Sequence, residues 1–124
     1  SARLSPVITG QAVADMADLA ATTHTDPAVL RYVAELAENT RKSGDVRLGV
    51  SVRGAISMIR IAKVWAASQG RRFVTPDDIL HLAGPVWSHR VVLDPEAEFA
   101  GTTPESVIAR VVEDTTAPQQ RLTA

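Results

Sequence analysis

The sequence contains no cysteine, few aromatic residues and no long apolar run. The absence of cysteine excludes disulfide bonds, thiolate nucleophiles and thiolate metal sites. No apolar run approaches the roughly 18 residues that a membrane-spanning helix requires, and the N-terminus lacks the layout of a signal peptide. We therefore expect a cytoplasmic protein. Because the chain begins at Ser1 without a methionine, we also expect it to be a piece of a longer protein.

Motifs for catalysis are absent as well. No glycine-rich phosphate loop occurs, and no serine lies in a nucleophile elbow. His24, His81 and His89 lie far apart in the sequence, and Gly84-Pro85 interrupts the helical pattern between the last two. We therefore expect neither a catalytic residue nor a metal site in this chain, which by itself is a poor candidate for an enzyme.

Charged residues are unevenly distributed along a chain whose formal net charge is −1. The segment 41–72 contains eight lysine and arginine residues and one acidic residue, Asp45, whereas the segments on both sides are acidic. One interpretation is a basic surface for a polyanion such as a nucleotide phosphate. The other is internal pairing between the basic segment and its acidic flanks. The sequence supports both interpretations equally.

The stretch from Leu48 to Gly70 predicts one central helix. Ser51 is a suitable N-cap, and Gly70 can adopt the left-handed conformation that ends many helices. The apolar residues of this stretch are Val52, Ile56, Ile59, Ile61, Ala62, Val64, Trp65 and Ala66. They fall on more than one face, so we expect a helix buried on most sides. If the Trp65 ring lies in the interior, replacing it by alanine should destabilise the fold by about 3–5 kcal/mol.

Capping signals predict the remaining helices. Cap residues followed by proline mark helix starts at Asp26-Pro27, Thr75-Pro76 and Thr103-Pro104. Asp78 has the spacing to complete a capping box with Thr75. A further helix is predicted from Thr9 to Thr22. Gly84-Pro85 is expected to break or kink the helix that starts at Pro76.

The chain is therefore predicted to be all-α, a small bundle of four to five helices with short connections. Short extended segments are expected at 45–48, 71–74 and 91–93, and a loop at 94–102. We expect residues 1–8 to form an extended lead-in, residues 9–116 the helical domain, and residues 117–124 a disordered tail.

Arg53 is an unusual residue for the first turn of a helix. The N-terminal end of a helix carries partial positive charge and favours anions over cations. Either the Arg53 side chain reaches a carboxylate of its own chain, such as that of Asp45, or it binds an anion from outside.

A set of short motifs occurs in a fixed order along the chain. These motifs are Thr40-Arg41, Leu48-Gly49-Val50-Ser51-Val52-Arg53, Gly70-Arg71, Val74-Thr75-Pro76-Asp77-Asp78-Ile79 and His89-Arg90. Together they resemble the C-terminal lid domain of MoxR-type AAA+ ATPases, from about Pro6 to Thr116. The resemblance implies a helical lid that follows an α/β nucleotide-binding core, with residues 1–8 as the lead-in from that core.

The resemblance also implies a role for Arg53. The lid of this family carries the sensor-2 motif Gly-x-Ser-Pro-Arg-Ala, which falls on Gly49, Ser51 and Arg53, and whose arginine approaches the ATP phosphates. Val52 and Gly54 stand where the family has proline and alanine. The resemblance therefore favours phosphate binding over an ion pair within the chain. Arg41 and Arg90 would instead brace the bundle or a surface between subunits.

Further expectations concern the whole protein and also follow from the resemblance. ATP and Mg²⁺ would be bound by the full-length parent, an ATP hydrolase, and this chain alone would bind neither and hydrolyse no ATP. Partners would be the upstream AAA+ core, neighbouring subunits of a chaperone-like ring, usually a hexamer, and a protein with a von Willebrand factor A domain. Hydrolysis would be coupled to motion of the lid.

Two alternatives remain. One is a helical nucleic-acid-binding module that uses the basic segment, with a steep salt dependence. The near-neutral net charge and the few aromatic residues argue against it. The other is a helical protein-interaction module that never contacts nucleotide, in which Arg53 would be dispensable for ATP turnover.

Overall fold

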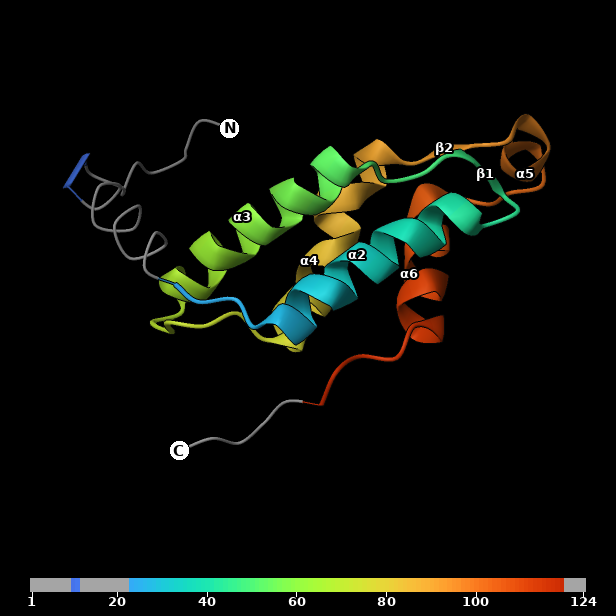
Figure 1. The fold of residues 1–124 in the computed structure, drawn as a ribbon. Coiled ribbons are helices and arrows are strands. Elements are labelled where there is room, and N and C mark those ends of the chain that lie inside the picture. Colours follow the sequence, from blue (N-terminus) through green and yellow to red (C-terminus); the bar gives the residue numbers. More distant parts are fainter. Residues whose placement is uncertain (1–9, 12–22, 120–124) are drawn as a thin grey trace.

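The computed structural model of the chain describes residues 10–11 and 23–119 (Figure 1). Its elements are α2 (Pro27–Lys42), β1 (Val46–Leu48), α3 (Val52–Ser68), α4 (Pro76–Trp87), the 3-10 helix η1 (Ser88–Arg90), β2 (Val92–Leu93), α5 (Pro95–Phe99) and α6 (Pro104–Asp114). The predicted helical bundle is thereby confirmed. The predicted lead-in over residues 1–8 lies outside the described residues, as does the predicted first helix apart from Gly10 and Gln11.

Helix starts follow the capping signals. The side chain of Asp26 accepts a hydrogen bond from the backbone N–H of Ala28 at 2.7 Å. The predicted capping box of Thr75 and Asp78 is present, and Thr103 forms a second one with Ser106. Helices α2, α4, α5 and α6 all begin with proline, whereas α3 begins with Val52.

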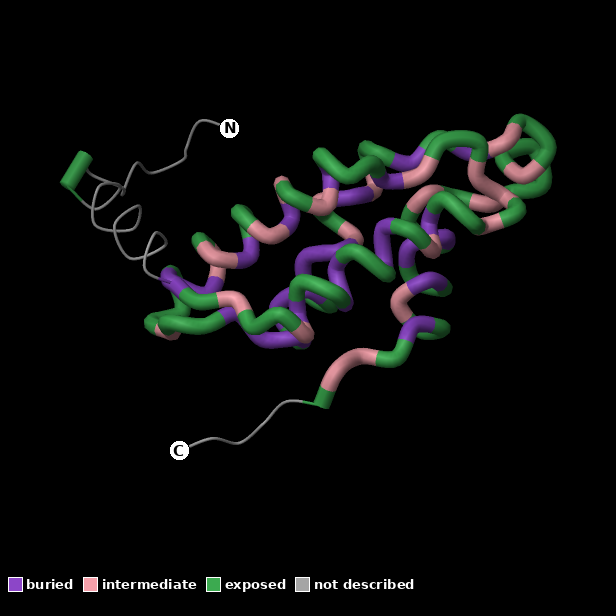
Figure 2. Tube along the Cα trace, in the orientation of Figure 1, coloured by how far each residue is buried: buried purple, intermediate pink, exposed green. Residues whose placement is uncertain are grey.

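The core lies between α2, α3, α4 and α6. Helices α2 and α3 run side by side in opposite directions (Figure 1), and both pack against α4, while α6 packs against α2 and α4. Figure 2 shows the buried stretches of these helices facing one another inside the bundle. The buried face of α2 consists of Val29, Tyr32, Val33, Leu36, Ala37 and Thr40.

Helix α3 is not buried on most sides, and this prediction was wrong. Its buried stripe consists of small and flexible side chains at spacings of four, namely Gly54, Met58, Ala62 and Ala66. Its branched residues lie outside this stripe, with exposed fractions of 68% for Val52 and 47% for Ile56. The reason is that α3 lies at the edge of the bundle and contacts its neighbours along one side.

The buried tryptophan is Trp87, which is 1% exposed, and not Trp65. Trp65 is half-buried, and its ring stacks on the exposed ring of His81 with a centroid distance of 4.8 Å. The expected loss of 3–5 kcal/mol on replacement by alanine therefore belongs to Trp87 and not to Trp65.

Helix α4 continues through Gly84-Pro85, contrary to the prediction that it would break or kink there. Pro85 is exposed and lies in the last turn, so few backbone hydrogen bonds remain beyond it. The carbonyl of Gly84 still accepts bonds from the backbone N–H and the hydroxyl of Ser88, the latter at 2.5 Å. These bonds link the last turn of α4 to the first residue of η1.

Two short strands pair with each other at one end of the bundle (Figure 1). Strands β1 and β2 are antiparallel, with Val46 opposite Leu93 and Leu48 opposite Val92, which confirms extended segments in both places. The predicted loop at 94–102 instead contains α5, which extends beyond the strands at the end of the molecule (Figure 1). Near the opposite end of α3, Phe73 forms a single bridge with His24.

An ion pair fixes the connection between α3 and α4. Arg71 donates to both carboxylate oxygens of Asp78, at 2.6 and 2.8 Å. Burial alone would raise the pKa of Asp78, but the hydrogen bonds from Arg71 and from the backbone N–H of Thr75, with the charge of Arg71, outweigh burial and lower it. The carboxylate is thus both the cap of α4 and the partner of Arg71.

We expect Asp78→Asn to lower the free energy of unfolding at pH 7 by about 1.5–3 kcal/mol, because Arg71 loses a charged partner. Since the pKa of Asp78 is lower in the folded chain, its contribution is fully present above the unfolded value of about 3.9. The contribution is lost as the pH falls through the folded value. The difference between wild type and variant in thermal melting should therefore shrink below about pH 4.

Asp77→Asn is the matched control, because Asp77 is exposed in the same turn and has no ion pair among the described residues. An equal loss of stability in the two variants would contradict a special role for the Arg71–Asp78 pair.

Candidate functional site

The first turn of α3 is the candidate site. The hydroxyl of Ser51 accepts a hydrogen bond from the backbone N–H of Gly54 at 3.1 Å, which confirms Ser51 as the N-cap. Gly70 follows the end of α3 with a φ of 76°, as predicted. Arg53 lies in the first turn with its side chain exposed. The predicted residues Gly49, Ser51 and Arg53 are thus brought together in one short segment.

The last turn of α2 holds the loop that leads into α3. The Thr40 hydroxyl accepts a hydrogen bond from the backbone N–H of Val50 at 2.8 Å and donates one to the carbonyl of Ala37 at 2.6 Å. The Arg41 guanidinium donates to the carbonyl of Val50. Both backbone polar groups of Val50 are therefore bonded to consecutive residues of α2, and Arg41 braces the bundle as expected.

Gly49 allows this loop to approach α2 closely. A Cβ atom at this position would lie 2.7 Å from the Cα and N atoms of Arg41 and 2.8 Å from the carbonyl carbon of Thr40. These atoms belong to a helix backbone and cannot rotate away. The requirement for glycine is therefore steric.

Gly54 allows a second close contact on the opposite side of the turn. The indole N–H of Trp87 donates to the carbonyl of Gly54 at 3.1 Å. A Cβ atom on Gly54 would lie 2.8 Å from Cγ1 of Val50 and 3.3 Å from Cδ of Arg90. The glycine that replaces the expected alanine therefore makes room for Val50 and for the stem of Arg90.

The Arg53 side chain has neither an ion pair nor a hydrogen bond with any residue in 10–11 or 23–119. Asp45, the acid considered as its partner, instead lies 3.9 Å from Arg110. The guanidinium of Arg53 is thus exposed, charged and uncompensated within the described part of the chain.

The cations of the basic segment 41–72 divide into those with a partner and those without one among the described residues. Arg41 binds a carbonyl, Lys42 pairs with Glu38 at 3.4 Å, and Arg71 pairs with Asp78. Among the residues that the structure describes, no ion pair is found for Arg47, Arg53, Arg60, Lys63 and Arg72. Internal pairing therefore accounts for a minority of these charges.

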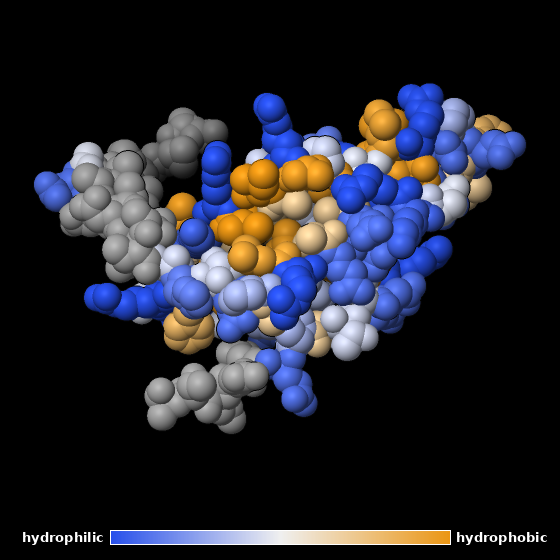
Figure 3. Space-filling view, in the orientation of Figure 1, coloured by the Kyte–Doolittle hydropathy of each residue, from blue (hydrophilic) through white to orange (hydrophobic). Residues whose placement is uncertain are grey.

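A hollow on the outer side of α3 is lined by Val52, Arg53, Ile56, Ser57 and Arg60. It combines two unpaired arginines with a hydroxyl and two exposed aliphatic side chains. Figure 3 shows an apolar area over α3 that is bordered by strongly hydrophilic side chains. Such a surface suits an anionic ligand or partner, because guanidinium groups bind carboxylates and phosphates with two parallel hydrogen bonds.

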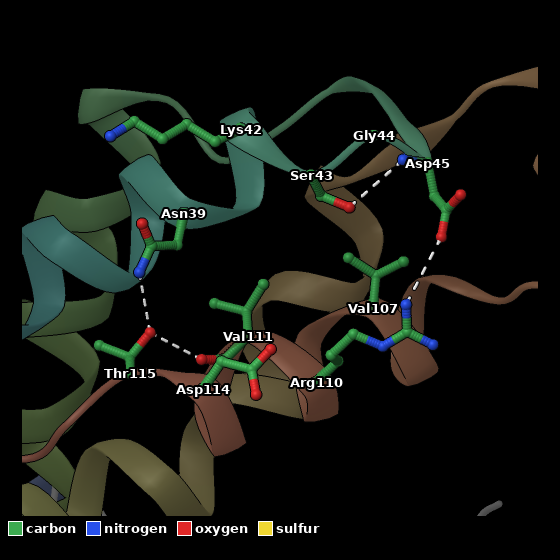
Figure 4. A pocket seen from close by; sticks show the side chains of 10 residues that line it. All are labelled: Asn39, Lys42, Ser43, Gly44, Asp45, Val107, Arg110, Val111, Asp114 and Thr115. Atoms are coloured by element: carbon green, nitrogen blue, oxygen red, sulfur yellow. Dashed lines mark hydrogen bonds and ion pairs between the residues drawn. The ribbon is translucent and has the colours of Figure 1, made fainter.

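A second hollow lies between the end of α2 and α6 (Figure 4). Here Asn39 donates to the hydroxyl of Thr115 at 2.9 Å, and that hydroxyl donates to the carbonyl of Val111 at 2.7 Å. Charges of both signs line this hollow, and Asp45 and Arg110 pair across it. The bonds from Asn39 to Thr115 and from Thr115 to Val111 therefore tie the end of α6 to α2.

The described part of the chain meets the requirements of neither a metal site nor a membrane-spanning helix. Residues 10–11 and 23–119 contain no group of three histidine, aspartate or glutamate side chains that could hold a metal ion. None of the described helices is both long and apolar enough to span a membrane.

Comparisons with known proteins agree on one family. Residues 38–111 match the family described as AAA lid domain. The chain is 36% identical to the uncharacterized protein YeaC of Bacillus subtilis over 96 residues, 77% of this chain and 30% of YeaC. It is 35% identical to protein MoxR of Paracoccus denitrificans over 89 residues, and 32% identical to chaperone MoxR1 of Mycobacterium tuberculosis over 111 residues.

The chain spans between 26% and 30% of the length of these relatives. Among solved structures, it superposes on a protein from Cytophaga hutchinsonii with a TM-score of 0.80 and 24% identity. This match covers 88% of the chain and 36% of that protein, and it shows a shared fold.

Proposed function

The chain belongs to the AAA lid domain family and is homologous to MoxR proteins, and on that premise we propose that it is the lid of an ATP hydrolase in which Arg53 binds the ATP phosphates. ATP and Mg²⁺ are held mainly by the core of the parent protein, and the lid contributes the guanidinium. The observation that carries this proposal is the exposed, unpaired Arg53 in a turn held from both sides.

The chemistry of this turn suits a phosphate. A guanidinium stays charged at all physiological pH values and can hold two phosphate oxygens at once. The N-terminal end of α3 adds partial positive charge at the same place. Because Thr40, Arg41 and Trp87 fix the turn to the bundle, a force on Arg53 is transmitted to the lid as a whole. Loss of the γ-phosphate would then release the lid from its closed position.

The exposed aliphatic residues of α3 support an upstream core as the first partner. Val52 and Ile56 are exposed beside Arg53, and such apolar areas mark interaction surfaces. A core that places ATP against Arg53 would cover them at the same time. The lid then packs on the core through its exposed aliphatic side chains and contacts the nucleotide phosphates through the arginine.

By the same family relationship we extend the proposal to the whole protein. It acts as a chaperone-like ATPase in the cytoplasm, assembled as a ring of several subunits, usually six, with a von Willebrand factor A domain protein as a partner. The relative MoxR1 is named a chaperone, which supports the chaperone-like part of this extension.

The test is ATP turnover by the full-length parent with Arg53→Ala. We expect kcat to fall about 10–100-fold, because removal of one charged donor to a developing oxyanion has effects of that order or larger. Thermal stability should stay unchanged, since Arg53 bonds to no other described residue. Arg53→Lys should recover part of the rate, because it keeps the charge and loses the bidentate geometry.

Arg72→Ala is the matched control, because Arg72 is exposed beyond the opposite end of α3 and has no ion pair with any described residue. Turnover by Arg53→Ala equal to that of Arg72→Ala would overturn the proposal. The chain would then be a helical interaction module without nucleotide contact.

A further inference from the structure

We propose that Arg60 is a second anion-binding residue of the hollow at Arg53, so that this hollow binds an extended phosphate chain and not one phosphate group. The inference rests on the proposed function and adds a residue to it. It starts from the observation that Arg53, Ser57 and Arg60 line one hollow on α3.

Helix geometry places the two arginines on the same side of α3. They are seven residues apart, which is close to two turns and about 10 Å along the helix axis. Ser57 lies between them, one turn from Arg53 and close to one turn from Arg60. All three residues face away from the buried stripe of Gly54, Met58, Ala62 and Ala66. An anion that enters the hollow therefore meets a donor at each end and a hydroxyl between them.

The charged residues of α3 are all positive. The helix contains Arg53, Arg60 and Lys63 and no acidic residue. Neither arginine pairs with a carboxylate anywhere in the described part of the chain. An exposed helix normally mixes both signs, because pairs of opposite charge a turn apart stabilise it. A surface that keeps its cations uncompensated attracts polyanions.

The length of the ligand is inferred from the distance between Arg53 and Arg60 along the helix. A single phosphate group offers all of its oxygens at one point, so two guanidinium groups can share it only if their side chains converge there. A chain of phosphates, as in a nucleoside triphosphate, presents anionic oxygens at both ends. Two arginines on one side of the helix, about 10 Å apart along its axis, suit the second ligand. The flanking Val52 and Ile56 exclude part of the solvent, which strengthens both contacts.

The test compares anions of different length, at millimolar concentration, with the purified chain at low ionic strength, where contacts too weak to hold ATP on the lid alone can still be measured. Nuclear magnetic resonance follows the arginine Nε–H signals during titration with orthophosphate, inorganic triphosphate and a single-stranded oligonucleotide. We expect triphosphate to bind about tenfold more tightly than orthophosphate, the effect of one added charged contact. Arg60→Gln should remove most of this difference and leave the orthophosphate affinity nearly unchanged.

Two further variants separate the possible failures. Arg53→Gln should weaken binding of both phosphates, and Arg72→Gln should change neither. If Arg60→Gln behaves like Arg72→Gln while Arg53→Gln weakens binding, the role of Arg60 is overturned and the proposed function stands. If Arg53→Gln also behaves like Arg72→Gln, both proposals fall.

Two other outcomes overturn the inference. Equal affinity for orthophosphate and triphosphate would show that the hollow holds a single phosphate. Tighter binding of the oligonucleotide, weakened alike by loss of Arg60 and of Arg72, would assign the basic surface to nucleic acid.

Discussion

Replacing Gly49 by alanine is expected to destabilise the chain by about 2–5 kcal/mol. The added methyl group would lie 2.7–2.8 Å from three backbone atoms of α2, which is closer than van der Waals contact allows. Overpacking of this kind costs about 1–3 kcal/mol. The loop can relieve it by moving away from α2, but Val50 then loses its bonds to Thr40 and Arg41, at about 1 kcal/mol each. Denaturant unfolding at equilibrium measures the loss.

Gly84→Ala is the matched control, because it is the same substitution in a different environment. Apart from its chain neighbours and its own helix backbone, nothing lies within 4 Å of a Cβ at position 84 in α4. Alanine in a helix is about 0.8–1 kcal/mol more favourable than glycine, but a Cβ before Pro85 disfavours the helical conformation, so the stability of this variant should stay close to that of the wild type. Equal destabilisation by both substitutions would show that the close approach at Gly49 is not the cause.

Trp87→Ala is expected to destabilise the chain by about 3–5 kcal/mol, the range for a large aromatic ring removed from a core. Trp87 is 1% exposed, lies among the helices of the core, and donates to the carbonyl of Gly54. Trp87→Phe keeps most of the ring and removes the donor. We expect it to lose about 1 kcal/mol from the hydrogen bond in addition to a smaller packing loss.

Trp65→Ala provides the comparison within the same chain. Its ring is half-buried and packs on His81, so we expect a loss of about 1 kcal/mol. Thermal or denaturant unfolding of the three variants gives the order of stability. A larger loss for Trp65→Ala than for Trp87→Ala would contradict the assignment of the buried ring.

Local signals in the sequence predict most of the helix boundaries. Asp26-Pro27, Thr75-Pro76 and Thr103-Pro104 mark the starts of α2, α4 and α6, because a cap side chain and a preset proline act within one turn. Ser51 and Gly70 likewise mark both ends of α3. Such features need no knowledge of the rest of the fold.

Burial of α3 could not be predicted in the same way. Its apolar residues on several faces suggest a helix surrounded by its own chain, yet Val52 and Ile56 face outward. Apolar residues at an interaction surface look the same in a sequence as residues of a core. The tryptophan assignment failed for the same reason, since Trp65 lies in the helix that was expected to be central and Trp87 follows the break expected at Pro85.

The candidate site was predicted in part. Arg53 and its cap Ser51 were identified from the position of a cation in a first turn and from the motif around it. The bonds that hold the turn, from Thr40 to Val50 and from Trp87 to Gly54, join residues 10 and 33 positions apart. Contacts at such separations leave no periodic pattern. The motif Thr40-Arg41 was a signal for the first, and nothing in the sequence marked the second.

The start of α3 differs from every other described α-helix in lacking proline. Val50 is fixed on one side of it and the carbonyl of Gly54 on the other, so rotational freedom is confined to the few residues between them. Fixing one backbone residue lowers conformational entropy by an amount equivalent to about 1–2 kcal/mol. If an anion binds Arg53 as proposed, it therefore has little disorder to remove, and most of its interaction energy would remain available to hold the lid closed.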